Sequence, residues 1–146
     1  MRGVLDASLL VAAVRTRNPR SASRLVIEAA AAGIYQPVIT DDIEAEYREV
    51  LSRDRIRRGA PPTFHRLATG IMEGLIGSAE RVEPDRSLRV VKDDPKDDKY
   101  VAAALAGRAE YVVTFDRRHL LVLGSHEGIR FVTPGAFLGI LRSGAG

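Results

Sequence analysis

The sequence contains no cysteine. Disulfide bonds and thiolate metal sites are therefore excluded, and nothing indicates an oxidising compartment. Any bound metal must use oxygen or nitrogen ligands, which favours hard cations such as Mg²⁺ or Mn²⁺. The histidines His65, His119 and His126 lack the paired spacing of zinc ligands, so a zinc site is not expected.

Long apolar runs are missing as well. No stretch reaches the roughly 20 apolar residues that a membrane-spanning helix needs. Asp6 comes too early in the chain for a secretory signal peptide. We therefore expect a cytoplasmic protein that does not associate with a membrane.

Aromatic residues and net charge are both low. Aromatic residues make up 5% of the chain, so stacking on bases is not an evident way to hold nucleic acid. The net charge of +3 permits an anionic partner without requiring one. Most basic residues are arginine, whose guanidinium can grip phosphate with two hydrogen bonds, although genomic base composition can produce the same bias.

What is present is the pattern of one α/β domain. The 146 residues are 45% hydrophobic, enough for a single core, and no repeat or long linker divides them. Strands are predicted at residues 2–5, 34–39, 79–82, 109–115 and 129–132, and helices at residues 8–14, 22–32, 64–76, 97–106 and 134–141 and after the N-cap Thr40. This alternation predicts a central, mostly parallel sheet flanked by helices on both faces. We expect the domain to cover residues 1–142, followed by a flexible tail at residues 143–146.

Acidic residues stand at four points of this pattern. Asp6 follows the first strand and Asp116 follows the strand at 109–115, so both should lie at the carboxyl edge of the sheet. Glu46 lies beside the apolar face of its helix, and Asp97 opens the helix that ends at residue 106. Each residue alone is explained by helix capping or by solvent exposure. Together they would repel one another, and a divalent cation would remove that conflict and support phosphodiester hydrolysis.

Five segments of the sequence resemble the PIN-domain family, in order and over almost the whole chain. They are residues 4–10 (VLDASLL), 39–53, 94–104, 112–116 (VVTFD) and 128–138. The likeness is closest to the VapC-like ribonuclease toxins of toxin–antitoxin systems. It implies a PIN fold and an endoribonuclease that uses Mg²⁺ or Mn²⁺ and leaves a 5′-phosphate and a 3′-hydroxyl. It also implies an antitoxin partner and a homodimer.

Carried over by position, the resemblance gives a set of metal ligands. They are Asp6, Glu46, Asp97 and Asp116. Asp97 is favoured for the third motif because it stands three residues before Tyr100, as in the family pattern. Asp98 is its competitor for that role, and both Asp98 and Asp94 are candidates for the outer shell.

The sequence also offers residues that could position or bind the RNA. The hydroxyls of Ser8 and Thr114 are candidates for orienting the acids or the substrate, although local capping explains them equally well. Candidate contacts to the RNA backbone are Arg15, Arg17, Arg117 and Arg118. The apolar stripe of the helix at 64–76 fits core packing, with an antitoxin or dimer contact as the alternative.

Two other functions are considered. A phosphoacceptor receiver domain needs a lysine after a late strand, but all lysines lie between Lys92 and Lys99. The second is a catalytically weak or inactive PIN-like module that binds RNA or protein. It stays open because Ser8 stands where family members commonly carry asparagine.

Overall fold

The computed structural model describes residues 1–91 and 95–144. Within these residues, six strands form one sheet in the order β3-β2-β1-β4-β6-β5. The strands are β1 (Arg2–Leu5), β2 (Gln36–Ile39), β3 (Glu80–Arg81), β4 (Tyr111–Val113), β5 (Ser125–His126) and β6 (Ile129–Val132). All neighbouring pairs are parallel except β5 and β6, which are antiparallel. The predicted α/β fold with a mostly parallel sheet is confirmed.

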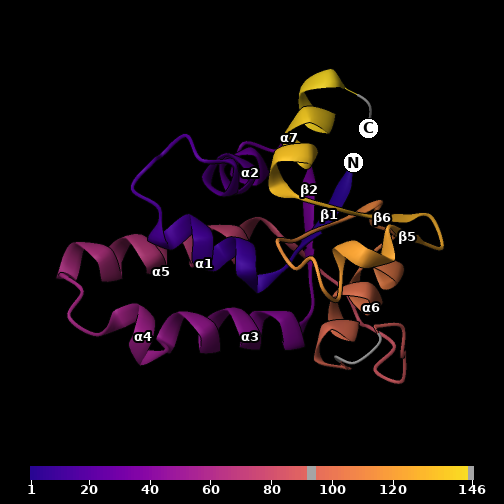
Figure 1. Cartoon of the computed structure of the whole chain (residues 1–146), viewed down its shortest axis with the longest axis horizontal. Helices are drawn as coiled ribbons and strands as arrows, with labels where there is room; N and C mark the ends of the chain where they lie inside the picture. Colours follow the sequence, from indigo (N-terminus) through magenta and orange to yellow (C-terminus); the bar gives the residue numbers. More distant parts are fainter. Residues whose placement is uncertain (92–94, 145–146) are drawn as a thin grey trace.

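Helices cover both faces of this sheet (Figure 1). They are α1 (Ala7–Arg15), α2 (Ala22–Ala31), α3 (Asp41–Ser52), α4 (Asp54–Arg57), α5 (Pro62–Ser78), α6 (Asp98–Ala106) and α7 (Pro134–Ser143), with 3-10 turns η1 (Pro95–Asp97) and η2 (Leu121–Leu123). Helices α1, α2, α5 and α7 pack on one another, whereas α6 packs on β1, β2 and β4. In the strand order, the connection from β1 to β2 leads toward β3, whereas the connection from β3 to β4 leads back toward β6. Because both crossovers are right-handed, α6 lies on the face of the sheet opposite to α1 and α2.

The start of α3 shows how the sequence sets a helix boundary. The Thr40 hydroxyl accepts a hydrogen bond from the Ile43 amide at 3.2 Å, and Thr40 itself is extended. The apolar face that begins at Ile43 is buried, and the Tyr47 hydroxyl on this face donates to the Leu5 carbonyl at the end of β1. This bond holds α3 against the strand that immediately precedes Asp6.

An aromatic cluster fills the core between the sheet and α7. The ring of Phe137 is fully buried, with its centroid 4.9 Å from that of Tyr35 and 5.5 Å from that of Tyr111. Gly3 in β1 faces this ring, because a Cβ atom there would be in ordinary van der Waals contact with it at 3.5 Å. Phe137 therefore brings α7 close to the central strand β1.

The structure adds detail between β4 and β6 and within β2. His126 lies in the short strand β5, and the helical structure within residues 117–123 is confined to η2. Pro37 is the second residue of β2, which is an inner strand of the sheet. Pro37 is tolerated there because β3 pairs only with Val38 and Ile39, so no bond to β3 requires its missing N–H.

Two further regions bear on the expectations. The stripe on α5 packs inward through Ala68, Met72 and Leu75, although Leu67 is exposed. Helix α7 extends to Ser143, and residues 145–146 of the expected tail lie outside the described part of the chain. None of the helices within the described ranges combines the length and apolar character needed to cross a bilayer.

Candidate metal centre

Asp6 joins the first strand to the first helix at the carboxyl edge of the sheet. Its amide donates to the Val113 carbonyl at 3.0 Å, which fixes it to the end of β4. Its side chain caps α1 by accepting from the Ser8 amide, and it is only 7% exposed. The position is therefore set by the sheet and by the helix together.

Two hydroxyl groups hold the Asp6 carboxylate. Oδ2 accepts from Thr114 Oγ1 at 2.6 Å and from Ser8 Oγ at 2.8 Å. Burial raises the pKa of Asp6 above its ordinary value, the two hydrogen bonds oppose this rise, and the negative charge of Glu46 adds to it. A nearby divalent cation would lower the cost of keeping this carboxylate ionised.

Thr114 links Asp6 to Asp116. Its fully buried hydroxyl donates to Asp6 and accepts from the Asp116 amide at 2.9 Å. Asp116 Oδ1 in turn accepts from the Arg118 and His119 amides, both at 3.0 Å. Thr114 therefore orients Asp6 and Asp116, which are far apart in the sequence. The turn after β4 also fixes the Asp116 side chain.

A group of three ligand atoms surrounds Asp116. Within the described ranges, one potential ligand atom each from Asp97, Asp116 and His119 lies within 4.8 Å of the others. Burial acts to raise the pKa of Asp116, but hydrogen bonds from the His119 amide, Asp97 and the Arg118 amide outweigh it and lower the pKa. Two carboxylates and an imidazole at this spacing fit a divalent cation.

The two aspartates of the third motif face different surroundings. Asp97 ends η1 and is the N-cap residue of α6, the helix that it was expected to open, and it belongs to the group around Asp116. Asp98 is buried, and its Oδ1 accepts from the Val90 and Val91 amides, both at 2.7 Å. Asp94 lies outside the described residues.

Glu46 approaches the edge from α3. Its carboxylate accepts from the Tyr100 hydroxyl and pairs with Lys99 Nζ at 3.2 Å. Tyr100 also accepts from the Ala7 amide at 3.2 Å, which connects Glu46 to the residue after Asp6. Burial raises the pKa of Tyr100 well above its ordinary value, so the phenol remains a donor.

The four predicted acids thus share one edge but do not form one tight group. Among the described residues, Asp6 and Glu46 are not part of the 4.8 Å group of Asp97 and Asp116. The metal centre thus has two halves, one with Asp6 and Glu46 and one with Asp97, Asp116 and His119. The hydroxyl of Thr114 links them by contacting Asp6 and the Asp116 amide. Both hydroxyls proposed from the sequence, Ser8 and Thr114, contact Asp6 directly.

Three contacts were missed or undervalued at the sequence level. His119 was not assigned to the site from the sequence, yet its Nδ1 lies 3.3 Å from Asp116 Oδ2. Lys99 and Tyr100 were not assigned to the site, although both contact Glu46. The sequence signal for His119 was its position three residues after Asp116, a spacing that also occurs in ordinary turns.

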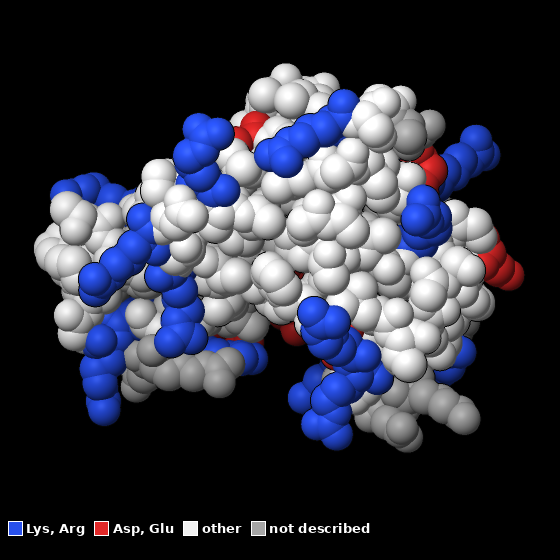
Figure 2. All heavy atoms as spheres, turned by 45° about the horizontal axis from the view of Figure 1, so that its top comes forward, with Lys and Arg blue, Asp and Glu red and all other residues white. Residues whose placement is uncertain are grey.

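The candidate arginines lie at two distances from this edge. Arg117 and Arg118 are exposed and directly follow Asp116. Arg15 and Arg17 are exposed at the far end of α1, about 13 Å from its start for a nine-residue helix. Figure 2 shows basic side chains on either side of a gap at the lower edge of the molecule, with acidic side chains visible inside it.

Replacing Thr114 by valine tests the link between the acids. The side chain keeps its volume, but Asp6 loses a donor and the Asp116 amide loses its acceptor. We expect metal affinity to fall about 10-fold to 100-fold, as is typical for groups that orient metal ligands. Titration calorimetry with Mn²⁺ measures this, and Thr114→Ser, which keeps the hydroxyl, should retain near wild-type affinity. Equal affinities in the valine and serine variants would contradict the assignment.

A family model described as PIN domain matches residues 2–118. A crystal structure of PAE2754 from Pyrobaculum aerophilum is similar in fold, with a TM-score of 0.64 and 18% identity, covering 98% of this chain and 90% of that one. A search of curated proteins gave no match.

Proposed function

The chain belongs to the PIN domain family, a family of metal-dependent nucleases, and on this premise we propose that it hydrolyses phosphodiester bonds in RNA. The observation that carries the proposal is the hydrogen-bond bridge through Thr114. It brings Asp6 and Asp116 to one edge of the sheet, where Asp97 and His119 join Asp116. Such clustered carboxylates are the means by which proteins hold the cations used in phosphodiester hydrolysis.

In this proposal, the acidic residues bind metal in two groups. Asp97, Asp116 and His119 would hold one divalent cation, Mg²⁺ or Mn²⁺, and Asp6 and Glu46 would complete the shell or hold a second. When bound, such a cation would lower the pKa of a coordinated water and offset negative charge on the scissile phosphate. Thr114 and Ser8 keep the Asp6 carboxylate in one orientation, and the Tyr100 hydroxyl does the same for Glu46.

Basic side chains next to the acids would bind the RNA backbone. Arg117 and Arg118 directly follow Asp116 in the chain, and Lys99 contacts Glu46. Arg15 and Arg17 would contact phosphates farther along the strand. Contacts of this kind weaken steeply as salt rises, because bound phosphates release their counterions.

A toxin role is the narrower form of the proposal. Its support is the sequence resemblance to VapC-like ribonucleases, which also motivates a cognate antitoxin and a homodimer as partners. The alternative is a PIN-like module that binds RNA or protein without cleaving it, which Ser8 at the asparagine position favours.

A cleavage assay separates these functions. Purified wild-type protein is incubated with fluorogenic RNA and with DNA of the same sequence, in Mg²⁺ or Mn²⁺, with and without EDTA. We expect RNA cleavage that EDTA abolishes and that added metal restores, and no comparable cleavage by Asp6→Ala. RNA binding without EDTA-sensitive cleavage would instead establish the binding module, and preferential cleavage of DNA would contradict RNA as the substrate.

A further inference from the structure

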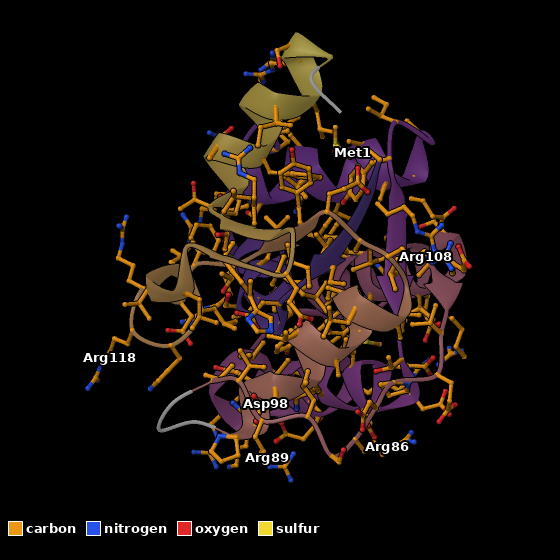
Figure 3. The ribbon with its side chains drawn as sticks, turned by 90° about the vertical axis from the view of Figure 1, so that its right-hand side faces the viewer. Met1, Arg86, Arg89, Asp98, Arg108 and Arg118 are labelled. Carbon is orange, nitrogen blue, oxygen red and sulfur yellow. The ribbon has the colours of Figure 1, made fainter. Side chains whose placement is uncertain are left out.

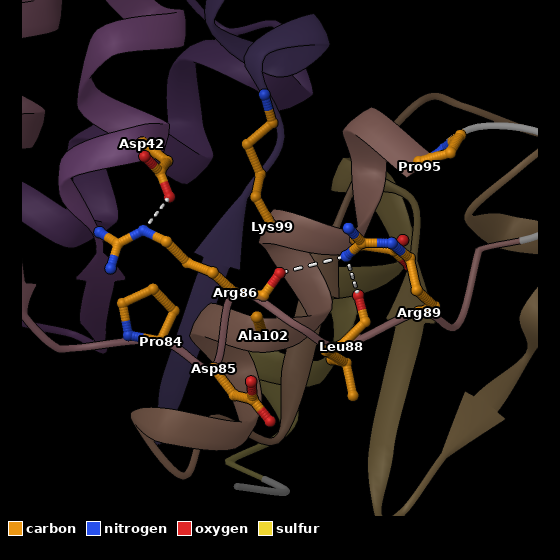
Figure 4. Close-up of a pocket in the computed structure, with 10 residues that line it drawn as sticks. Asp42, Pro84, Asp85, Arg86, Leu88, Arg89, Pro95, Lys99 and Ala102 are labelled. Carbon is orange, nitrogen blue, oxygen red and sulfur yellow. Dashed lines mark hydrogen bonds and ion pairs between the residues drawn. The ribbon is translucent and has the colours of Figure 1, made fainter.

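A pocket of about 230 Å³ lies between α3, residues 84–89 and the first turns of α6 (Figure 4). Its charged lining is balanced, with three acidic and three basic side chains. They are Asp42, Asp85 and Asp98, and Arg86, Arg89 and Lys99. The volume is below the roughly 300–1,000 Å³ of sites for drug-sized ligands, so the pocket suits one group of nucleobase or ribose size.

Asp98 gives this pocket an unused acceptor. Its Oδ1 is occupied by the Val90 and Val91 amides, whereas its Oδ2 is buried and has no hydrogen-bond partner among the residues that the structure describes. The side chain as a whole is 4% exposed. A buried carboxylate oxygen without a donor is costly, and such groups in native proteins usually meet a ligand, a water or an ion.

The pocket is not built for a metal. In the described ranges, the acidic residues that line it do not form a group of three ligand atoms within 4.8 Å. Asp42 is instead paired with Arg86 at 3.2 Å, and Asp85 accepts from the Ser87 amide and hydroxyl. The free acceptor therefore calls for an N–H or O–H donor rather than for a cation.

Arg89 supplies the complementary charge. One of its terminal nitrogens donates to the Arg86 and Leu88 carbonyls, and these bonds hold the guanidinium beside the pocket (Figure 4). Among the described residues it has no acidic partner. Arg86, Arg89 and Asp98 lie at the same end of the molecule (Figure 3). The pocket thus offers a cation for a phosphate and an acceptor for a donor.

The pocket adjoins the candidate metal centre. Lys99 lines it and also pairs with Glu46 at 3.2 Å. Asp98 directly follows Asp97, which belongs to the group around Asp116. A strand whose phosphate lies at the acids can therefore place a neighbouring nucleotide in the pocket.

We propose that this pocket binds one ribonucleotide of the substrate strand, with a phosphate at Arg89 and an N–H or O–H group donating to Asp98 Oδ2. The inference rests on the proposed function for its biological setting, but the pocket chemistry is independent of cleavage. Binding of a ribonucleotide here would make the pocket a specificity subsite for the nucleotide beside the cleavage point.

Ala102→Leu tests the pocket by filling it. Ala102 lines the pocket from α6, is 4% exposed and belongs to neither half of the metal centre. We expect the variant to bind a short RNA about 10-fold more weakly, the loss that one missing hydrogen bond to a charged group produces. Its Mn²⁺ affinity should be unchanged. Ala136→Leu, at an exposed position of α7, is the matched control and should bind RNA like the wild type.

Binding is measured without divalent metal, so that the outcome does not depend on cleavage. Fluorescence anisotropy with a short RNA is combined with NMR titration of the four ribonucleoside 5′-monophosphates, and the same DNA forms a separate arm. Exposed Arg89 is replaced by alanine as a second variant, which keeps the test valid if Ala102→Leu does not fold.

Monophosphates that shift the resonances of α6 residues, together with weaker RNA binding by both variants, would support the subsite. RNA affinities equal to wild type in folded Ala102→Leu and in Arg89→Ala would overturn it. Cleavage that proceeds normally in both variants would reject the subsite and leave the nuclease proposal intact. Nucleotide binding by a protein that cleaves no RNA would reject the nuclease and leave the subsite.

Discussion

Asp116→Asn is expected to slow metal-dependent RNA cleavage by about 100-fold to 1,000-fold, the range found when one electrostatic contact to a transition state is removed. The change takes one negative charge from the group formed with Asp97 and His119. Asparagine keeps a carbonyl oxygen, which can still accept from the Arg118 and His119 amides as Oδ1 does now. The turn after β4 should therefore survive, and the loss should be chemical rather than structural.

Single-turnover cleavage at saturating protein, with thermal melting in parallel, measures this effect. Glu127→Gln is the matched control, because Glu127 is an exposed carboxylate in the turn between β5 and β6. It should cleave RNA like the wild type. An Asp116→Asn protein that melts normally and cleaves at the wild-type rate would remove Asp116 from the proposed site.

The largest expected effect on stability comes from Phe137→Ala. The ring is fully buried and packs edge-on against Tyr35 and tilted against Tyr111. Removing it leaves a cavity between α7 and β1, and such changes typically lower the free energy of unfolding by about 3–5 kcal/mol. Since whole domains are stable by only about 5–15 kcal/mol, the variant should be close to unfolding at room temperature.

Urea denaturation followed by circular dichroism measures this change. Phe115→Ala is the matched control, because the same side chain is removed at a position that is 44% exposed. Its free energy of unfolding should change by about 0.5 kcal/mol or less, as is usual at surface positions. Similar losses in the two variants would show that the Phe137 ring does not carry the packing described.

The order of elements was predictable from the sequence, but the pairing of weak elements was not. The central strands and the Thr40 cap carry strong local signals, namely buried apolar runs and a hydroxyl at a helix start. Strand β5 has only two residues, Ser125 and His126, and it is a strand only because it pairs with β6. A segment this short shows no alternation, so only the folded hairpin reveals it.

The location of the site at the carboxyl edge of the sheet was predictable from the sequence, but the directions of its side chains were not. Asp6 and Asp116 follow adjacent parallel strands, and strand order alone brings them together. Asp97 and Asp98 could not be separated in this way, because neighbouring residues in a helix point about 100° apart. The 3-10 turn η1 also shifts the phase before α6 begins, and Asp97, the N-cap residue of α6, makes no capping hydrogen bond with its side chain.

The adjacency of β1 and β4 has a consequence for synthesis of the protein. Asp6 and its partner Thr114 are 108 residues apart, so at about 5–20 residues per second the first strand waits roughly 5 to 20 seconds for its central neighbour. A growing chain can pair β1 with β2 well before β4 exists. The residues of the proposed nuclease centre can therefore meet only late in synthesis, with β6 and α7 still to follow. A chain that stops before Thr114 would carry Asp6 and Glu46 without the strand that aligns them, so we expect it to lack the proposed nuclease activity.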